Sequence, residues 1–108
     1  MSEIIKISSE VIGTEKTNSV NARELHQVLE IGKDFCFIGQ EYKIQVGKKD
    51  FKIDLLFYHR ELRCLVAFEL KIDEFSPSYL GQLEFYLEAL DRDIKKAYEN
   101  PSIGVLLC

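Results

Sequence analysis

Three segments in the middle of the chain have the apolar pattern of β-strands. Residues 35–46 (FCFIGQEYKIQV), 51–59 (FKIDLLFYH) and 64–72 (CLVAFELKI) are rich in aromatic and β-branched side chains. Only short polar links separate them, GKKD at 47–50 and RELR at 60–63. We therefore expect an antiparallel three-stranded meander.

Two further segments have helical periodicity. Residues 21–32 (NARELHQVLEIG) begin with an asparagine suited to an N-cap, carry Glu24 at the capping-box position and end in glycine. Ser76-Pro77 starts a second helix, with serine as the cap, that we expect to run to about Tyr98. Its apolar face is formed by Leu80, Leu83, Leu87, Leu90 and Ile94.

Apolar residues also mark both ends of the chain. Residues 3–12 predict a short strand or extended arm, and residues 102–108 (SIGVLLC) predict a buried strand. The core order is α-β-β-β-α-β, an α/β (α+β) fold in one small domain. Because a strand at the end of the sequence leaves an open edge, we expect a second copy to cover it in a homodimer, or a partner element to cover it instead.

Composition narrows the function classes. The 108 residues are 46% hydrophobic and 30% charged, as in soluble globular proteins. No apolar run approaches the ~20 residues that span a membrane. The start, Met1-Ser2-Glu3, is not that of a signal peptide, so we expect a cytoplasmic protein with reduced thiols.

Basic side chains are few but clustered. The net charge of −4 argues against a general nucleic-acid binder. Lys48, Lys49 and Lys52 nevertheless lie close together in the sequence, as do Arg60 and Arg63. These five residues are either ordinary surface charges or a local nucleic-acid-binding surface.

Two charged residues interrupt the otherwise apolar third strand of the meander. Glu69 and Lys71 are two positions apart and therefore share one face. Folding the hairpin on the turn 60–63 places Asp54 opposite Glu69 and Lys52 opposite Lys71. The residues between them then point to the other face; these are Phe51, Ile53, Leu55 and Phe57 on one strand, and Val66, Phe68 and Leu70 on the next.

Two carboxylates facing each other repel unless a cation lies between them. Magnesium is held by one or two carboxylates together with waters and substrate phosphates, and manganese is a substitute. Asp54 and Glu69 are therefore candidate metal ligands, and Lys71 is a candidate for stabilising charge during phosphodiester hydrolysis. The alternative is that Lys71 forms a structural ion pair with one of the carboxylates.

Four other polar residues are weaker candidates. Gln82 and Tyr86 lie one turn apart on the second helix and can reach the same site, or Tyr86 belongs to the core. Glu24 and Glu41 are further carboxylates, although Glu24 also fits a helix cap.

These residues lie in a stretch that is recognisable as a whole. FKIDLLFYHRELRCLVAFELK, with GQLEFYL, closely resembles the C-terminal domain of the YhcG-type PD-(D/E)XK nucleases over about residues 35–108. The resemblance implies a restriction-endonuclease-like core and a magnesium-dependent nuclease site that acts on DNA rather than RNA. It implies that Asp54, Glu69, Lys71, Gln82 and Tyr86 are catalytic, and that the Leu70 backbone carbonyl is a further metal ligand. The proline of the family motif is absent, because Ile53 precedes Asp54.

A second resemblance covers the start of the chain. Residues 5–35, with the core VNARELH, are similar to phage antirepressors of the AntA/AntB type. We expect residues 1–34 to supply the first helix of the core and residues 35–108 to form the nuclease-like part. The resemblance implies an association with phages or mobile elements. The alternative function is a catalytically weak or inactive nuclease fold that binds nucleic acid or a protein partner, as an antirepressor does.

Overall fold

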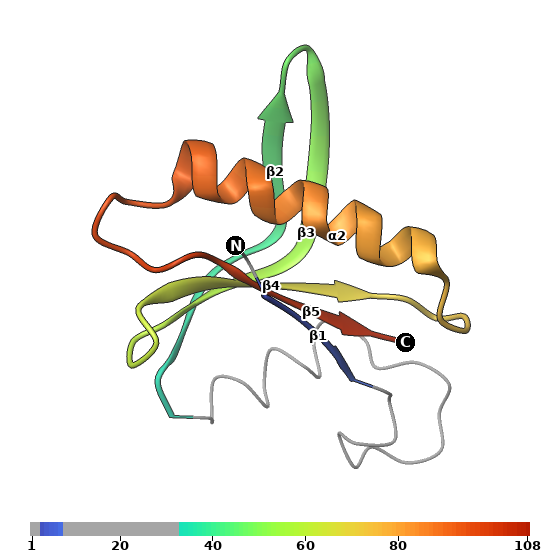
Figure 1. Ribbon diagram of the computed structural model, residues 1–108, viewed down its shortest axis with the longest axis horizontal. Helices are drawn as coiled ribbons and strands as arrows, with labels where there is room; N and C mark the ends of the chain where they lie inside the picture. The colour runs from blue at the N-terminus through green and yellow to red at the C-terminus, as the bar shows by residue number, and fades with distance from the viewer. Residues whose placement is uncertain (1–2, 8–32) are drawn as a thin grey trace.

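A mixed five-stranded sheet with the order β1-β5-β4-β3-β2 forms the centre of the structure (Figure 1). This computed structural model describes residues 3–7 and 33–108. The predicted meander is confirmed, because β2, β3 and β4 pair antiparallel. The last strand, β5, runs parallel to both of its neighbours, β4 and β1. The strands are β1 (Glu3–Ile7), β2 (Phe35–Val46), β3 (Lys49–His59), β4 (Cys64–Leu70) and β5 (Ile103–Leu107).

One helix crosses a face of the sheet and makes the parallel connection from β4 to β5 possible (Figure 1). It consists of α2 (Pro77–Ala89) and a π-helical turn, η2 (Leu90–Ile94), so it ends before the predicted Tyr98. Lys95 Nζ donates to the carbonyls of Lys96 and Glu99, which stabilises a turn where the helix was expected to continue. Ser76 is the N-cap residue, but its hydroxyl makes no capping bond.

Apolar side chains form one cluster on each face of the sheet. The cluster between the sheet and the helix includes the fully buried Leu56, Leu83 and Leu106. The cluster on the opposite face includes Leu55 and Phe57. Alternation along the strands therefore separates the two clusters as expected for a sheet buried on both faces.

The hairpin of β2 and β3 changes direction at Asp54. The β3–β4 ladder stops at the pair Leu55–Phe68, while β2 and β3 stay paired out to Val46 and Lys49. The outer half of the hairpin therefore leaves the sheet and rises beside α2 (Figure 1), with the ring centroids of Phe51 and Phe85 5.1 Å apart.

This divergence corrects two predictions. Lys52 does not face Lys71, since it pairs with Lys43 on β2 beyond the end of the β3–β4 ladder. Phe51 and Ile53 do not share a face with Leu55; they pack in the cluster on the helix side. The physical reason is the contact of the outer hairpin with α2, which a flat three-stranded meander would not make.

The last strand is not an edge of the sheet. β5 lies between β1 and β4 and pairs with both. Because β1 and β4 already cover both edges of β5, this strand gives no reason to expect a second copy, and the homodimer stays a prediction. The helix predicted over 21–32 lies outside the described residues. Within the described residues, no helix has the length and apolar character needed to cross a membrane.

Gly104 on β5 provides a test of how tightly the helix packs on the sheet. A Cβ atom at Gly104 would lie 2.9 Å from atoms of Leu83 and Leu87, both almost fully buried. We expect Gly104→Ala to lower the free energy of unfolding by about 1–3 kcal/mol, because the leucines have little room to move.

A Cβ at Gly81, on the exposed side of α2, meets nothing within 4 Å. Gly81→Ala should raise stability by roughly 0.5–1 kcal/mol. Urea denaturation of the two variants measures both effects, and equal stability would contradict this packing.

Candidate active site

Asp54 and Glu69 come together where β3 and β4 separate. The Asp54 backbone N–H donates to Glu69 Oε1 at 3.3 Å, and the Leu70 N–H donates to Asp54 Oδ2 at 2.8 Å. Each carboxylate thus accepts a hydrogen bond from the backbone of the opposite strand, one position beyond the last ladder pair. The predicted juxtaposition of these two side chains on one side of the hairpin is what the structure shows.

Glu69 is the more deeply buried of the two, with only 4% of its surface exposed. Burial, followed by the negative charge of Asp54, raises the pKa of Glu69 to about 8, against the smaller lowering effects of the Asp54 N–H and the Lys71 charge. In the metal-free chain, the Glu69 carboxyl group is therefore in a site that disfavours its ionised form.

Lys71 and the helix complete the cluster of predicted residues. Lys71 Nζ donates to Gln82 Oε1 at 3.0 Å, and Gln82 Nε2 donates to the hydroxyl of Tyr86 at 3.0 Å. Burial, followed by the charge of Glu69, raises the pKa of Tyr86. The hydrogen-bonded row Lys71–Gln82–Tyr86 therefore runs along α2 beside the carboxylates.

Lys71 makes no ion pair with any residue that the structure describes. Its ammonium group lies instead over the ring of Tyr79, 4.8 Å from the ring centroid. The hydroxyl of Tyr79 donates to Asp73 Oδ2, which fixes the ring in place. The structural ion pair that sequence reasoning left open is thus not present in the described geometry.

Tyr79 and Asp73 were not among the residues selected from the sequence. Tyr79 lies three residues before Gln82, so both can reach a lysine at the end of β4 from one side of the helix. That spacing was a usable signal. The contribution of Asp73 depends on the loop between β4 and α2, whose path the sequence pattern does not specify.

The described residues fit a divalent cation only in part. No three His, Cys, Asp or Glu side chains gather in a metal-binding arrangement within residues 3–7 and 33–108. Glu41 lies between Gln40 and Tyr42, which pair with Leu55 and Ile53, but it is exposed and its backbone is left-handed, with φ of 49°. Glu24 lies outside the described residues. Two carboxylates, one of them buried, match the magnesium sites in which waters and substrate phosphates supply the other ligands.

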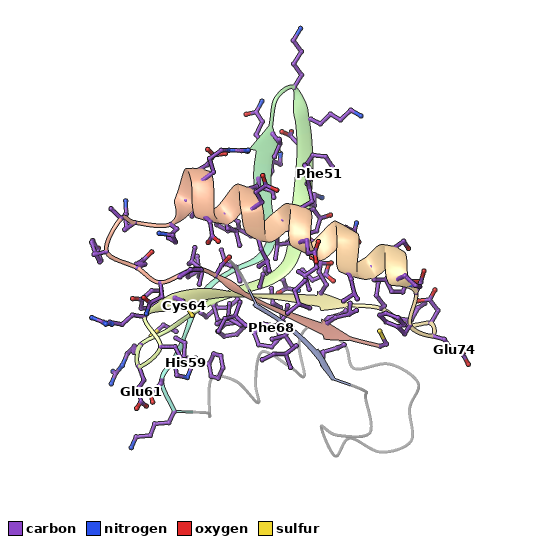
Figure 2. All side chains as sticks on the ribbon, viewed as in Figure 1. Phe51, His59, Glu61, Cys64, Phe68 and Glu74 are labelled. Carbon is purple, nitrogen blue, oxygen red and sulfur yellow. The ribbon has the colours of Figure 1, made fainter. Side chains whose placement is uncertain are left out.

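The predicted basic residues fall into two separate groups. Lys48, Lys49 and Lys52 lie on the outer hairpin, whereas Arg60 and Arg63 lie in the turn at the other end of β3. Figure 2 shows this turn, marked by Glu61, at the opposite side of the molecule from Glu74 in the β4–α2 loop. Arg60 also pairs with Asp34, with 3.6 Å between Nη2 and Oδ1.

Comparison with known proteins identifies the family of this chain. The family described as "YhcG PDDEXK nuclease domain" matches residues 1–108. The chain belongs to this family. Its mixed sheet and single described helix are consistent with the restriction-endonuclease-like core of such nucleases, so the predicted fold class is confirmed.

A curated relative is also similar to this YhcG-type domain. The protein named "Putative nuclease YhcG" from Escherichia coli (strain K12) is 42% identical over 81 residues. The match covers 75% of this chain and 22% of the relative, so the chain spans less than a quarter of the length of that protein. No solved structure matches the chain.

The stability of this YhcG-type domain should depend on pH through Glu69. Folding raises the pKa of Glu69 from about 4.5 to about 8, so the folded state binds this proton more tightly than the unfolded chain does. The stability that the bound proton contributes is complete below pH 4.5 and is lost as the pH rises through 8. Glu69→Gln keeps an oxygen to accept the Asp54 N–H and carries no charge. In buffer with a chelator, we expect this variant to be more stable than the wild type at pH 9, by a few kcal/mol.

The stability difference between Glu69→Gln and the wild type should shrink toward pH 5. Thermal unfolding across pH 5–9 measures it, with Glu84→Gln on the exposed side of α2 as the control. A difference that is independent of pH would show that Glu69 is not held in an environment that disfavours its charge.

Proposed function

We propose that this chain is a magnesium-dependent nuclease domain that hydrolyses phosphodiester bonds in DNA, with Asp54, Glu69 and Lys71 as its catalytic residues. The observation that carries the proposal is the pair of carboxylates, one of them buried, beside a lysine whose ammonium group contacts Gln82 and the ring of Tyr79 and forms no ion pair among the described residues. Membership of a nuclease family supports the reaction class.

Asp54, Glu69 and the backbone carbonyl of Leu70 would hold the cation, with manganese as a substitute for magnesium. The chemistry that such a cation supplies is Lewis-acid polarisation of a phosphate and a nucleophile at neutral pH. The two backbone N–H groups of Asp54 and Leu70 hold the carboxylates in position, so little rearrangement is needed for binding.

Lys71 would contact the phosphate that is being cleaved. Its ammonium group carries a positive charge and hydrogen-bond donors, which stabilise the charge that develops on the phosphate oxygens. Gln82 accepts one of these donors and is itself held by Tyr86, so the two helical residues orient Lys71. In this assignment Gln82 and Tyr86 act on the lysine or on the phosphate, rather than on the metal.

The two groups of basic residues lie at opposite ends of β3, so we assign them different roles. Lys48, Lys49 and Lys52 are assigned to the DNA backbone, because they share the hairpin that carries Asp54. Arg60 and Arg63 are about 20 Å or more from Asp54 along the extended strand and are weaker candidates. The association with phages or mobile elements rests on residues 5–35 alone and adds no chemistry to this site.

Cleavage of plasmid DNA tests the proposal. In magnesium the wild type should cleave, and chelation should abolish the activity. Asp54→Asn and Lys71→Met should each lower the rate by about 100-fold or more, since each removes a charge that acts on the transition state. Asp93→Asn, which removes an exposed carboxylate paired with Arg92, is the control and should cleave like the wild type.

Cleavage that survives the chelator, or that survives both substitutions, would contradict the proposal. Binding of DNA by the wild type without cleavage in magnesium or manganese would favour the alternative of a non-catalytic binding module.

A further inference from the structure

Positive charge is concentrated on the outer half of the β2–β3 hairpin, residues 42–53, which we name the basic arm. It carries Lys43, Lys48, Lys49 and Lys52 against a single acid, Asp50, for a net charge of +3. The other 96 residues contain ten Lys and Arg and seventeen Asp and Glu, for a net charge of −7. Although the chain as a whole is acidic, the basic arm is therefore a local surface of positive charge.

The basic arm projects away from the body of the protein (Figure 1). Lys43 and Lys52 are paired across the two strands, Lys48 lies in the two-residue turn with Gly47, and Lys49 begins β3. Lys43 is 3.9 Å from Asp50, and both side chains are more than half exposed, so this contact neutralises little of the charge. Among the described residues, the other three lysines form no ion pair.

The aromatic residues of the arm are turned inward. Phe51 packs against Phe85 and Tyr86 of α2, and Tyr42 packs against the cluster on the helix side. Proteins that bind single-stranded nucleic acid usually present exposed aromatic rings on which bases stack. The lysine-bearing surface of the arm offers charge without such rings, which favours a ligand whose bases are already paired.

A two-stranded β-ribbon fits the major groove of B-form DNA, which is about 12 Å wide, whereas the major groove of A-form RNA is too narrow for side-chain readout. We propose that the basic arm binds duplex DNA, with the ribbon in or across the major groove and Lys43 and Lys52 on the phosphates.

The position of the arm relative to the candidate active site supports this assignment, which rests on the proposed nuclease function. Lys52 precedes Asp54 by two residues, about 7 Å along the strand, and Lys49 precedes it by five, about 17 Å. The lysines thus extend outward from the carboxylates in one direction along the same ribbon. A duplex held by the arm would have its backbone within reach of Asp54 and Glu69.

Binding of a fluorescent 20-base-pair duplex, measured by anisotropy in a chelator, tests the arm without requiring cleavage. The full chain is compared with Lys43→Gln/Lys52→Gln and with Lys48→Gln/Lys49→Gln, whose positions in and beside the turn are exposed. Lys33→Gln/Lys96→Gln removes the same charge from exposed residues outside the arm that have no assigned role in binding DNA, and it is the matched control.

We expect each arm variant to weaken duplex binding roughly tenfold and to lower the slope of log affinity against log salt by about two. The control should change affinity less than twofold, and a single strand of the same length should bind more weakly than the duplex. Equal losses in the arm and control variants, or no loss in either, would overturn the inference. Equal binding of single strands, with equal sensitivity to the arm variants, would overturn the preference for duplex DNA.

The cleavage assay gives a separate answer. Binding that depends on the arm lysines, without metal-dependent cleavage, would reject the proposed nuclease function and support the basic arm as a DNA-binding surface. Metal-dependent cleavage that does not depend on the arm lysines would support the nuclease function and reject the basic arm.

Discussion

Burial of Glu69 beside Asp54 costs free energy in the metal-free chain, because a carboxylate loses hydration there and meets a second negative charge. The two backbone N–H groups at the end of the β3–β4 ladder recover part of that cost. Lys71 does not neutralise the pair directly, since its ammonium group lies between Gln82 and the ring of Tyr79. The arrangement keeps two acidic groups and one basic group close together but separately held, as a site for a cation and a phosphate requires.

The divergence of the hairpin from the sheet links this site to the rest of the fold. If β3 and β4 stayed paired beyond Leu55, their backbone N–H groups would be used in the ladder and not on the carboxylates. Contact of Phe51 with Phe85 and Tyr86 draws the outer hairpin toward α2 instead. The same contact positions Tyr86 beside the carboxylates and leaves the lysines of the basic arm on an exposed ribbon. The change of direction at Asp54 thus affects three features: the contact of Phe51 with α2, the backbone hydrogen bonds to the two carboxylates and the exposure of the lysines of the basic arm.

Much of the fold and of the candidate site follows from sequence periodicity. The four-residue turn 60–63 defines the β3–β4 register, and that register alone brings Asp54 and Glu69 together. Helical spacing then brings Gln82 and Tyr86 to one side of α2. The wrong predictions concern tertiary contacts. Ile53 and Lys52 have other neighbours than expected because the outer hairpin leaves the sheet, and the local sequence pattern does not predict this divergence. The end of the helix was placed too late because the bonds of Lys95 and Glu99 to backbone atoms compete with the helix there.

The claim that Asp54 and Glu69 share a divalent cation is tested most directly by anomalous diffraction from crystals of the chain soaked in manganese. The account predicts an anomalous peak in contact with both carboxylates, which is lost in Asp54→Asn crystals treated in the same way. Manganese bound elsewhere, with the Asp54 and Glu69 carboxyl groups in contact only with each other and with the protein, would contradict it.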